Sequence, residues 1–550
     1  MQFTQMYAKS SGVRYDGNRT QIDFAPDLGR EPTFFKGKII DIIRYRDAMI
    51  ALRDVVVSDL NYKPKDHSAY QEWVQEQYLT DIADILHARD AKQAAYAQQI
   101  NKLQAQLKIM RQKKRKRDDG YYKAQRRYFD WLYHHDPDAW MVLDPVITVA
   151  PDQVFFEAFS LDESSYGRLA VHESQFTEVT AFQYGTTNID FSDHLLDELQ
   201  RMRSYRPTVF QIDPSGFEVA TEKREVYKEK KIDVPESWVR GFLQVQSAMN
   251  LPMDTFTIQP IDMYNLCTFL RRNREKKGPR SLKYVLSPGQ PVHVVIEPWD
   301  EVLSFRDSVY TGTESKEIRV WGRRRLHLME KLLPLTQTIT VHLLGNGMPS
   351  FYVLDLGSLS FTLGLSGWTR NDWADAGHFD LMIGKASPVT STDRMAVFKA
   401  LKKIKTATPS LLAHQTQLSE LVVQSSLRQL CESGKVMFDI EVGKYRLREL
   451  TQEPITFKEP LPKNPRETKA EKWIQQQKAT LHRSTYTDQG HLILQGNVNE
   501  LHPQVKRDQN GRILEATCSC YFHNQNHLMR GPCEHILALL LLHQGEEVPS

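Results

Sequence analysis

Short runs of aromatic and β-branched residues dominate the pattern between residues 139 and 388. Such runs favour β-strands, and turn sequences rich in Gly, Pro, Asp and Asn separate several of them. The predicted strands include 154–159, 209–212, 217–219, 338–344 and 351–356. Asp213-Pro214-Ser215-Gly216 separates 209–212 from 217–219, and Gly345-Asn346-Gly347 lies between the last two runs. Because helix-forming stretches such as 326–333 alternate with the strands, the pattern predicts an α+β body of one or two domains.

Helical periodicity replaces the strand pattern between residues 65 and 138. The span 68–117 contains no Pro or Gly, and apolar residues repeat at helical spacing near its end. Asp118-Asp119-Gly120 ends this helix and 121–135 forms a returning one, so we expect a long helical hairpin. An intermolecular coiled coil needs several clean heptads, which the stretch lacks. The pattern of residues 1–64 leaves their fold open, since 39–60 fits one helix or two short strands.

Residues 394–450 combine three helix patterns with a short hairpin. Pro409 is typical of a first helical turn, Ser419 of an N-cap, and Gly434 of a helix end. The segments 436–441 and 444–447 then pair as a wing. This order of elements resembles a winged helix-turn-helix domain.

DNA binding by this domain depends on the side chains that it exposes. Packing of Val423 and Leu427 into the core places a poor set of base readers on the outer face of the third helix. That set is Leu421, Gln424, Ser425 and Arg428. Cations suited to phosphates cluster on or near the first helix, at Lys399, Lys402, Lys403 and Lys405. Contact with DNA through these lysines and a protein-docking or spacer role both stay open.

Composition narrows the class of protein. The chain has 550 residues, 41% hydrophobic and 25% charged, with a net charge of +3. It is long enough for three or four domains and is not a uniformly polycationic binder. No apolar run approaches the roughly 18 residues that cross a bilayer, and the first residues lack an apolar signal-peptide core. Five cysteines form no disulfide framework, which predicts a cytoplasmic location.

Proline and small polar residues mark two predicted linkers, at 386–393 and 451–469. They divide the chain into parts that differ in residue composition and hydrophobic pattern. The expected parts are an N-terminal region 1–64, a helical arm 65–138, an α+β body 139–388, a winged helix 394–450, a linker 451–470 and a C-terminal module 471–550.

Two basic runs are candidate contacts for anions. Residues 111–117 hold six cations and lie where a helix C-terminus favours positive charge, so a solvated helix end competes with a phosphate contact. Arg323-Arg324-Arg325 would crowd the positive end of a helix that starts near Gly322, which is unfavourable unless anions lie close. We expect pairing with Glu297, Asp300 or Glu301, and an anionic partner surface is the alternative.

The sharpest chemical signal lies near the C-terminus. Cys518 and Cys520 form a Cys-x-Cys pair, and Cys533 and His535 form a Cys-x-His pair after twelve intervening residues. Three thiolates and one imidazole make the closed tetrahedral set that structural Zn²⁺ prefers. A predicted hairpin at 505–516 delivers the first pair, and the second pair opens an apolar helix at 534–543. The spacing therefore predicts one Zn²⁺ held by these four residues, with His523 and His527 as rival ligands.

The loop between the ligand pairs is a candidate partner-binding surface. Metal tethers residues 521–532 at both ends, which lowers the entropy cost of ordering the loop on binding. We expect His527 and Arg530 to contact the partner, and neutralising the negative zinc site is an alternative role for Arg530. The apolar helix is expected to pack under the 505–516 hairpin and against a helix near Trp473.

A Cys-x-Cys pair after a hairpin and a Cys-x-His pair at a helix start resemble the SWIM ββα zinc finger, over residues 485–545. This resemblance implies a role in DNA binding or protein–protein interaction. Four further stretches resemble large uncharacterised bacterial SWIM proteins, which tend to accompany MoxR-type AAA ATPases and von Willebrand factor A-domain proteins. These stretches are FFEAFSLDESSYGRL, RVWGRRRL, LLGNGMPSF and LSGWTRNDW. The wider resemblance implies a protein partner of one of these two kinds.

Familiar catalytic motifs are absent from the sequence. It contains no GxxxxGK[ST], HExxH or GxSxG, and a strand pattern follows Gly345-Asn346-Gly347 where a dinucleotide site needs a helix. We therefore expect a multidomain α+β protein that recognises protein, nucleic acid or both and is not an enzyme. The alternatives are an enzyme with an unrecognised site in 139–388 and a DNA-binding regulator acting through the winged helix.

Overall fold

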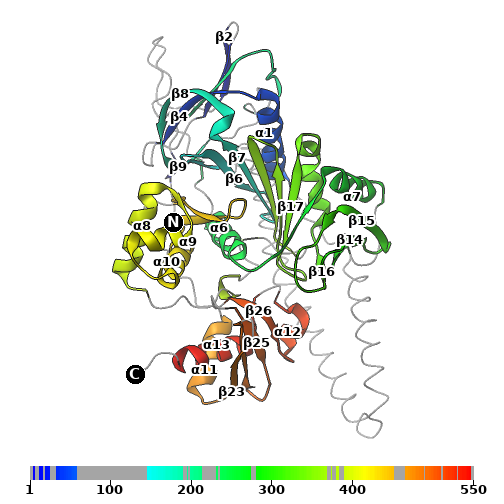
Figure 1. Ribbon diagram of the computed structural model, residues 1–550, viewed down its shortest axis with the longest axis vertical. Helices are drawn as coiled ribbons and strands as arrows, with labels where there is room; N and C mark the ends of the chain where they lie inside the picture. Colours follow the sequence, from blue (N-terminus) through cyan, green and yellow to red (C-terminus); the bar gives the residue numbers. More distant parts are fainter. Residues whose placement is uncertain are drawn as a thin grey trace, which may run out of the picture. The chain divides into compact units, whose positions relative to one another are not determined.

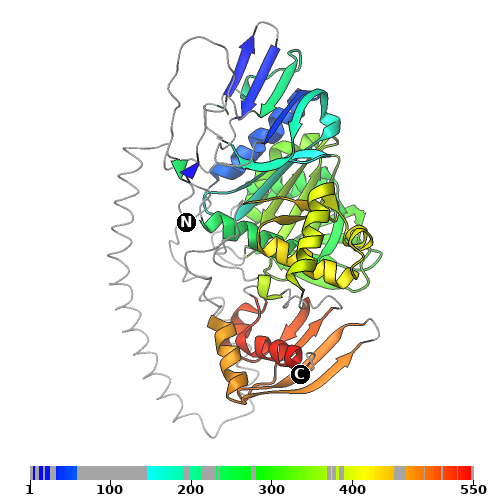
Figure 2. The same ribbon diagram turned by 90° about the vertical axis from the view of Figure 1, so that its left-hand side faces the viewer.

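The computed structural model (Figures 1 and 2) describes residues that all fall within one compact unit of the chain. The described residues are 4–5, 12–16, 19–24, 33–58, 145–189, 195, 199–212, 231–232, 236–273, 280–367, 373, 379–382, 389–450, 465–487, 490–508, 512–528 and 531–546. The predicted helical arm 65–138 and its basic run 111–117 lie outside them. Within the described residues, no helix combines the length and apolar character that crossing a membrane requires.

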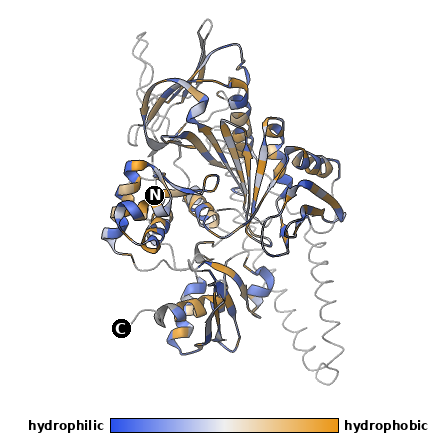
Figure 3. Ribbon diagram, viewed as in Figure 1, coloured by the Kyte–Doolittle hydropathy of each residue, from blue (hydrophilic) through white to orange (hydrophobic). Residues whose placement is uncertain are grey.

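An antiparallel eight-stranded sheet forms the centre of the body. Its strands, in spatial order, are β12 (Asp254–Ile258), β17 (Thr338–Leu343), β18 (Ser350–Asp355), β19 (Leu359–Leu365), β7 (Ser165–His172), β6 (Gln153–Phe159), β5 (Val146–Val149) and β9 (Gly185–Asn188). The predicted hairpin around Gly345-Asn346-Gly347 is confirmed, since β17 and β18 pair in register across that turn. Hydrophobic residues concentrate along these strands (Figure 3).

A five-stranded sheet joins the N-terminal residues to the body. Its strands, in spatial order, are β2 (Gly12–Asp16), β3 (Arg19–Phe24), β10 (Thr208–Ile212), β4 (Phe34–Ile39) and β8 (Phe176–Gln183). β10 pairs with β3 along one edge and with β4 along the other. The predicted strand 209–212 is confirmed as part of β10, and both of its edges are used in this sheet; the predicted strand 217–219 lies outside the described residues.

Three smaller sheets complete the strands of the described residues. A four-stranded sheet has the order β15 (Glu301–Val309), β14 (Pro291–Ile296), β13 (Leu282–Leu286) and β16 (Lys316–Val320). β1 (Thr4–Gln5) pairs with β11 (Lys231–Ile232), and β20 (Thr406–Ala407), β22 (Lys444–Leu447) and β21 (Val436–Asp439) form a three-stranded sheet. The four strands of the C-terminal module are described with the metal centre.

Helices cover these sheets. In the body they are α1 (Ile42–Val57), α6 (Glu236–Met249), α7 (Pro260–Arg272) and the 3-10 segments η1 (Glu173–Gln175), η2 (Arg323–Leu335) and η3 (Phe379–Met382). α1 settles the ambiguity of 39–60 in favour of one helix, and the side chain of Asp41 caps it by accepting from the Arg44 amide at 3.0 Å.

The paired strands β6 and β7 are covered on both faces, so almost every residue in them is buried. On one face, α1 packs so closely that a Cβ on Gly167 would lie 3.2 Å from Val55. On the other face, the Phe159 ring packs edge-to-face against Trp238 of α6, with ring centroids 5.4 Å apart. Met437 of β21 packs on this second face as well.

Residues 389–450 form three helices and the three-stranded sheet. The helices are α8 (Ser391–Ile404), α9 (Pro409–Thr416) and α10 (Glu420–Glu432). The side chain of Ser419 caps α10, as predicted. α8 begins at Ser391 with Thr390 as its N-cap, so the predicted linker 386–393 overlaps this helix.

The predicted outer face of α10 is wrong. α10 packs against α6 of the body, which Figure 1 shows beside it. Ser425 is buried, and the Arg428 side chain is only 13% exposed and lies 3.8 Å from Glu432. Leu421 alone of the four predicted outward residues is strongly exposed, at 53%. The sequence could not show this, because it gives no sign of which other element a helix face meets.

A buried charge network joins the β21–β22 hairpin to β6 and β7. Asp439 on β21 accepts from Arg168 of β7 at 2.9 Å and from Arg446 of β22 at 2.5 Å. Arg448 pairs with Glu157 of β6 at 3.4 Å, and both side chains are fully buried. Each of these charges leaves water on folding and therefore depends on its partner.

The arginines after Trp321 find partners within the body. Arg325 pairs with buried Asp162 at 3.6 Å, and Arg323 donates to the backbone carbonyl of Glu297. The Glu297 carboxylate instead binds Arg319, at 2.8 Å. Pairing within the chain was expected, but the acceptors of Arg325 and Arg323 are not the predicted carboxylates. Arg325 binds Asp162 from a distant segment, and Arg323 binds a backbone carbonyl.

We predict that Asp439→Asn loosens the hairpin from the body. The substitution removes the buried carboxylate that Arg168 and Arg446 share and leaves them only their second partners, Glu441 and Asp152, a loss of up to about 3–5 kcal/mol. Hydrogen exchange of the β21 and β22 amides should accelerate by about 10²-fold or more. Glu432→Gln on the exposed side of α10 is the control, with an expected cost below about 1 kcal/mol. Unchanged exchange in Asp439→Asn would contradict a dependence of the hairpin on this network.

The same network predicts a pH window for stability. Burial alone would raise the pKa of Glu441, but the His172 hydrogen bond and the Arg168 charge outweigh burial and lower it from 4.5 to about 2. The hydrogen bond to Glu441 raises the pKa of His172 above 6.5. The Glu441 contribution is therefore complete above about pH 4.5 and is lost as pH falls toward 2. The His172 contribution is complete below about pH 6.5 and is lost as pH rises through its raised pKa.

Stability against urea should accordingly be highest between about pH 4.5 and 6.5. Glu441→Gln should flatten the acidic side of the stability profile, and His172→Gln should flatten the alkaline side. Urea unfolding across the pH range measures both. Profiles that keep their wild-type shape in both variants would show that this pair does not set the window.

Candidate metal centre

The described residues of the C-terminal module form one sheet and three helices. The strands, in spatial order, are β23 (Ala479–Tyr486), β24 (Leu492–Val498), β25 (Gln504–Arg507) and β26 (Ile513–Thr517). The helices are α11 (Pro465–Gln475), α12 (Tyr521–Asn526) and α13 (Glu534–Glu546). The predicted linker 451–469 is too long, since α11 already begins at Pro465; a proline without an amide hydrogen suits a first helical turn.

A hairpin and a helix start position the four predicted ligands. β25 and β26 pair antiparallel, which confirms the predicted hairpin, although its Asn510-Gly511 turn lies outside the described residues. Cys518 and Cys520 follow β26 directly, and Cys520 also caps α12 by accepting from the His523 amide at 3.3 Å. Cys533 precedes α13, and His535 lies in its first turn.

The side chains of Cys518, Cys520, Cys533 and His535 converge on one point. One ligand atom from each lies within 4.8 Å of the other three, and all four residues are buried. A tetrahedron with Zn–S bonds of about 2.3 Å has edges of about 3.8 Å, so small side-chain shifts would close the set on an ion. His523 and His527 are not in this cluster, which favours His535 as the nitrogen ligand.

The electrostatics of the cluster fit a bound cation. The Cys533 thiol beside Cys518 stabilises a thiolate there and lowers the pKa of Cys518 to about 4. Proximity to Cys518, followed by burial, raises the pKa of Cys533, and burial raises that of Cys520. The Cys518 thiol therefore loses its proton readily, whereas the Cys520 and Cys533 thiols resist deprotonation. A divalent cation would remove that resistance. The Nδ1 atom of His535 is also buried without a hydrogen-bond partner among the described residues.

One face of α11 supports the ligand-bearing segments. Trp473 stacks on the His535 ring with centroids 4.6 Å apart. Lys469 pairs with Glu534 at 2.6 Å, and Arg466 donates to the Pro532 carbonyl at 2.7 Å. Sequence reasoning included Trp473 but missed Arg466 and Lys469. Their spacing of three and four residues was the available signal, because it places all three on one helical face.

The apolar helix α13 is buried, as expected, against a different part of the sheet. It packs on α11 and lies chiefly across β23 and β24, with less contact to β25 of the predicted hairpin. A Cβ on Gly496 of β24 would lie 2.5 Å from Leu539 of α13. The missing side chain at Gly496 therefore permits the close approach of helix and sheet.

The predicted loop 521–532 contains a short helix, α12, which the sequence analysis missed. His523 is buried on its inner side, whereas Tyr521, Asn524, Gln525 and His527 are exposed. The capping sulfur of Cys520 was the missed signal, because cysteine is not among the usual N-cap residues. Arg530 lies outside the described residues.

The lysines proposed for anion contact lie together but differ in surroundings. Lys399, Lys402 and Lys403 are exposed on α8, and Lys405 is its partly buried C-cap. Lys402 is 4.0 Å from Glu449. Arg428 is on α10 and is largely covered, so the structure does not bring it into the lysine group.

Comparisons with known proteins identify the C-terminal module. Residues 503–544 match the SWIM zinc finger family. No curated protein matches the chain. A crystal structure of Proliferating Cellular Nuclear Antigen from Entamoeba histolytica overlaps 41% of this chain and 89% of that chain, with 11% identity and a TM-score of 0.30. The match and the Cys/His cluster together show that this chain contains a SWIM zinc finger domain at residues 503–544.

Proposed function

We propose that this chain is a zinc-binding recognition protein whose SWIM domain contacts a protein or a nucleic acid. The main support for this proposal is that the side chains of four residues converge on one point; they are Cys518, Cys520, Cys533 and His535. A closed set of four protein ligands leaves no open coordination position for substrate, so the ion would stabilise the fold instead of taking part in catalysis.

The zinc proposal predicts one equivalent of Zn²⁺ per chain. Cys520→Ser removes one thiolate and should lower zinc affinity at least about tenfold, with local unfolding of residues 503–544 because metal binding and folding are coupled. Elemental analysis measures the zinc, and hydrogen exchange locates the unfolding. Cys267→Ser is the matched control, since Cys267 is also buried but lies in α7 of the body.

Two outcomes would contradict the proposal. The first is less than half an equivalent of zinc in protein produced with ample zinc. The second is equal zinc content in Cys520→Ser and the wild type.

The exposed side of α12 is the proposed contact surface of the SWIM domain. Tyr521 is 82% exposed, Gln525 is exposed on the same short helix, and His527 is exposed at its C-cap. α12 begins at a proposed zinc ligand and is therefore held in position before a partner arrives. Pre-positioning of this kind lowers the entropy cost of binding. Arg530 stays a proposed contact on the basis of the sequence alone.

Substitutions on α12 and α13 should separate binding from folding. Tyr521→Ala combined with Gln525→Ala should keep zinc and fold but weaken partner binding about tenfold or more, because both side chains point to solvent. Leu539→Asp should unfold the domain, since it places a charge in the core under β24. Binding to DNA, RNA and proteins of a cell lysate, with zinc content in parallel, measures both. A folded Leu539→Asp variant that has lost its partner would assign the contact to α13 instead.

A winged helix-turn-helix domain at residues 394–450 is a second proposed contact site, for the DNA backbone. Contact of α10 with α6 favours α8 as the contact surface, because α10 is covered while Lys399 and Lys403 are exposed one helical turn apart. Such binding would tolerate any sequence and weaken steeply with salt.

The pair Lys399→Glu and Lys403→Glu should reduce duplex DNA binding about tenfold or more. Loss of two phosphate contacts should also lower the slope of log K against log salt by about 2. Arg428→Ala should change binding less than about twofold. Titrations of labelled duplexes of two unrelated sequences, at several salt concentrations, measure the affinity of the lysine variant, its salt slope and the affinity of Arg428→Ala. A sequence preference that disappears in Arg428→Ala would assign reading to α10 and contradict the proposal.

The resemblance to large bacterial SWIM proteins supports a MoxR-type ATPase or a von Willebrand factor A-domain protein as the protein partner, and we propose a cytoplasmic location. Co-purification of the wild-type chain with each candidate, beside the Tyr521→Ala and Gln525→Ala variant, would test the pairing. An enzyme with a site in residues 139–388 is the alternative function. Catalytic turnover that survives deletion of residues 390–550 would favour it.

A further inference from the structure

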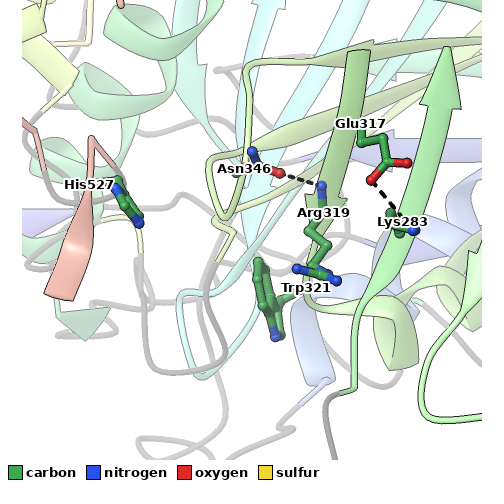
Figure 4. Close-up of a pocket in the computed structure, with 6 residues that line it drawn as sticks. All are labelled: Lys283, Glu317, Arg319, Trp321, Asn346 and His527. Atoms are coloured by element: carbon green, nitrogen blue, oxygen red, sulfur yellow. Dashed lines mark hydrogen bonds and ion pairs between the residues drawn. The ribbon is translucent and has the colours of Figure 1, made fainter. Parts of the chain in front are cut away.

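A cavity of about 310 Å³ lies at the edge of the β13–β16 sheet (Figure 4). It brings together side chains from three sequence signals that zinc binding does not explain. These are the Trp321 segment, the Gly345-Asn346-Gly347 turn and the end of α12. The lining residues are Lys283, Glu317, Arg319, Trp321, Asn346 and His527.

The turn at residues 345–348 fixes Arg319 and Asn346 in place. The Asn346 side-chain oxygen accepts from the Arg319 amide at 2.7 Å, and the Gly347 amide donates to the Arg319 carbonyl at 2.7 Å. Because its oxygen is used by the backbone, the Asn346 side chain offers its NH₂ group to a ligand. The polar wall is therefore set before binding.

Hydrogen-bond donors exceed acceptors around this cavity. Arg319 contacts Glu297 through Nε at 2.9 Å and Nη2 at 2.8 Å, which leaves Nη1 for another acceptor. Lys283 lies 3.5 Å from Glu317, whose side chain is 63% exposed, so solvent weakens that pair. Donors from Arg319, Lys283 and Asn346 favour an anionic ligand with several acceptor oxygens.

Rings complete the lining. The Trp321 indole lies next to the Arg319 guanidinium, and the His527 imidazole is on the far side of the opening (Figure 4). An indole face is a stacking surface for a nucleobase, and stacking beside cations is how proteins hold single-stranded nucleic acids. The volume lies at the lower end of the range that small-ligand sites span.

We propose that this cavity binds one nucleotide unit, with its phosphate on Arg319, Lys283 and Asn346 and its base against Trp321. The unit can come from a free nucleotide or from single-stranded nucleic acid, which share this chemistry. The inference goes beyond the proposed zinc function, since of the lining residues that the structure describes only His527 belongs to the SWIM domain.

Asn346→Asp tests the phosphate position in the full chain. Aspartate keeps the oxygen that accepts from the Arg319 amide but replaces the donor NH₂ with negative charge. We expect at least tenfold weaker binding of adenosine monophosphate, of a short oligothymidylate, or of both. Ser304→Asp is the matched control, because it adds the same charge at an exposed position of β15 outside the cavity lining, and it should bind as the wild type does.

Trp321 provides a second, independent variant. Trp321→Leu should weaken binding about tenfold through loss of stacking, whereas Trp321→Phe should retain most of it. Thermal melting confirms that each variant is folded. Calorimetry with the monophosphate and fluorescence anisotropy with labelled oligothymidylate separate the two sources of the nucleotide unit.

Three results would overturn the proposal. One is no binding of either probe by the wild type. Another is unchanged binding by Asn346→Asp. The third is tighter binding of an acidic peptide than of both nucleotide probes. Zinc loss in Cys520→Ser with intact nucleotide binding would separate this site from the zinc proposal.

Discussion

The second face of β6 and β7 carries a constraint on which the rest of the described fold depends. Glu157 and Arg168 lie opposite each other on strands whose residues are almost all buried, and Glu157 accepts from Tyr166 of β7 at 2.8 Å. Among the described residues, the closest oppositely charged partners of both side chains come from outside the two strands. Arg448 and Asp439 of the segment 436–448 supply them. Leaving either charge unpaired would cost about 3–5 kcal/mol, comparable with the whole stability of many domains. The hairpin is therefore held to the body, and α10 is held against α6 with it.

This attachment changes what the winged helix-turn-helix pattern implies. In a free domain the third helix is available to a major groove, but here its Ser425 and Arg428 are covered. Exposed cations persist on α8, at Lys399 and Lys403, because that helix lies away from the contact with α6. A surface that reaches phosphates without entering a groove binds through charge and has little means to read sequence.

The sequence was informative where structure depends on neighbours in the chain. Turn residues predicted the β17–β18 and β25–β26 hairpins, and paired spacing predicted the cluster that holds Cys518 and His535. The sequence contained no signal for pairing between strands that lie far apart in the chain. β10 pairs with β3, 188 residues earlier at Thr208↔Thr20, and with β4, 169 residues earlier at Thr208↔Ile39, and no local feature of 208–212 specifies that choice. Helix α12 was missed for another reason, since a cysteine serves both as its cap and as a proposed metal ligand.

Arginine content alone is a poor guide to partner surfaces in this chain. Arg323 donates to a backbone carbonyl, Arg325 pairs with buried Asp162, and the basic cluster around them is thereby used within the fold. Arg319 differs because Glu297 occupies only Nε and Nη2, while the Asn346 turn fixes its backbone at the cavity edge. A cation contributes to recognition when the fold satisfies part of its hydrogen-bonding capacity and leaves the remainder directed at open space. By this criterion the cavity beside Trp321, and not the run of three arginines, is where the body offers unused hydrogen-bond donors to a ligand, while Glu297 and Glu317 balance the charges of Arg319 and Lys283.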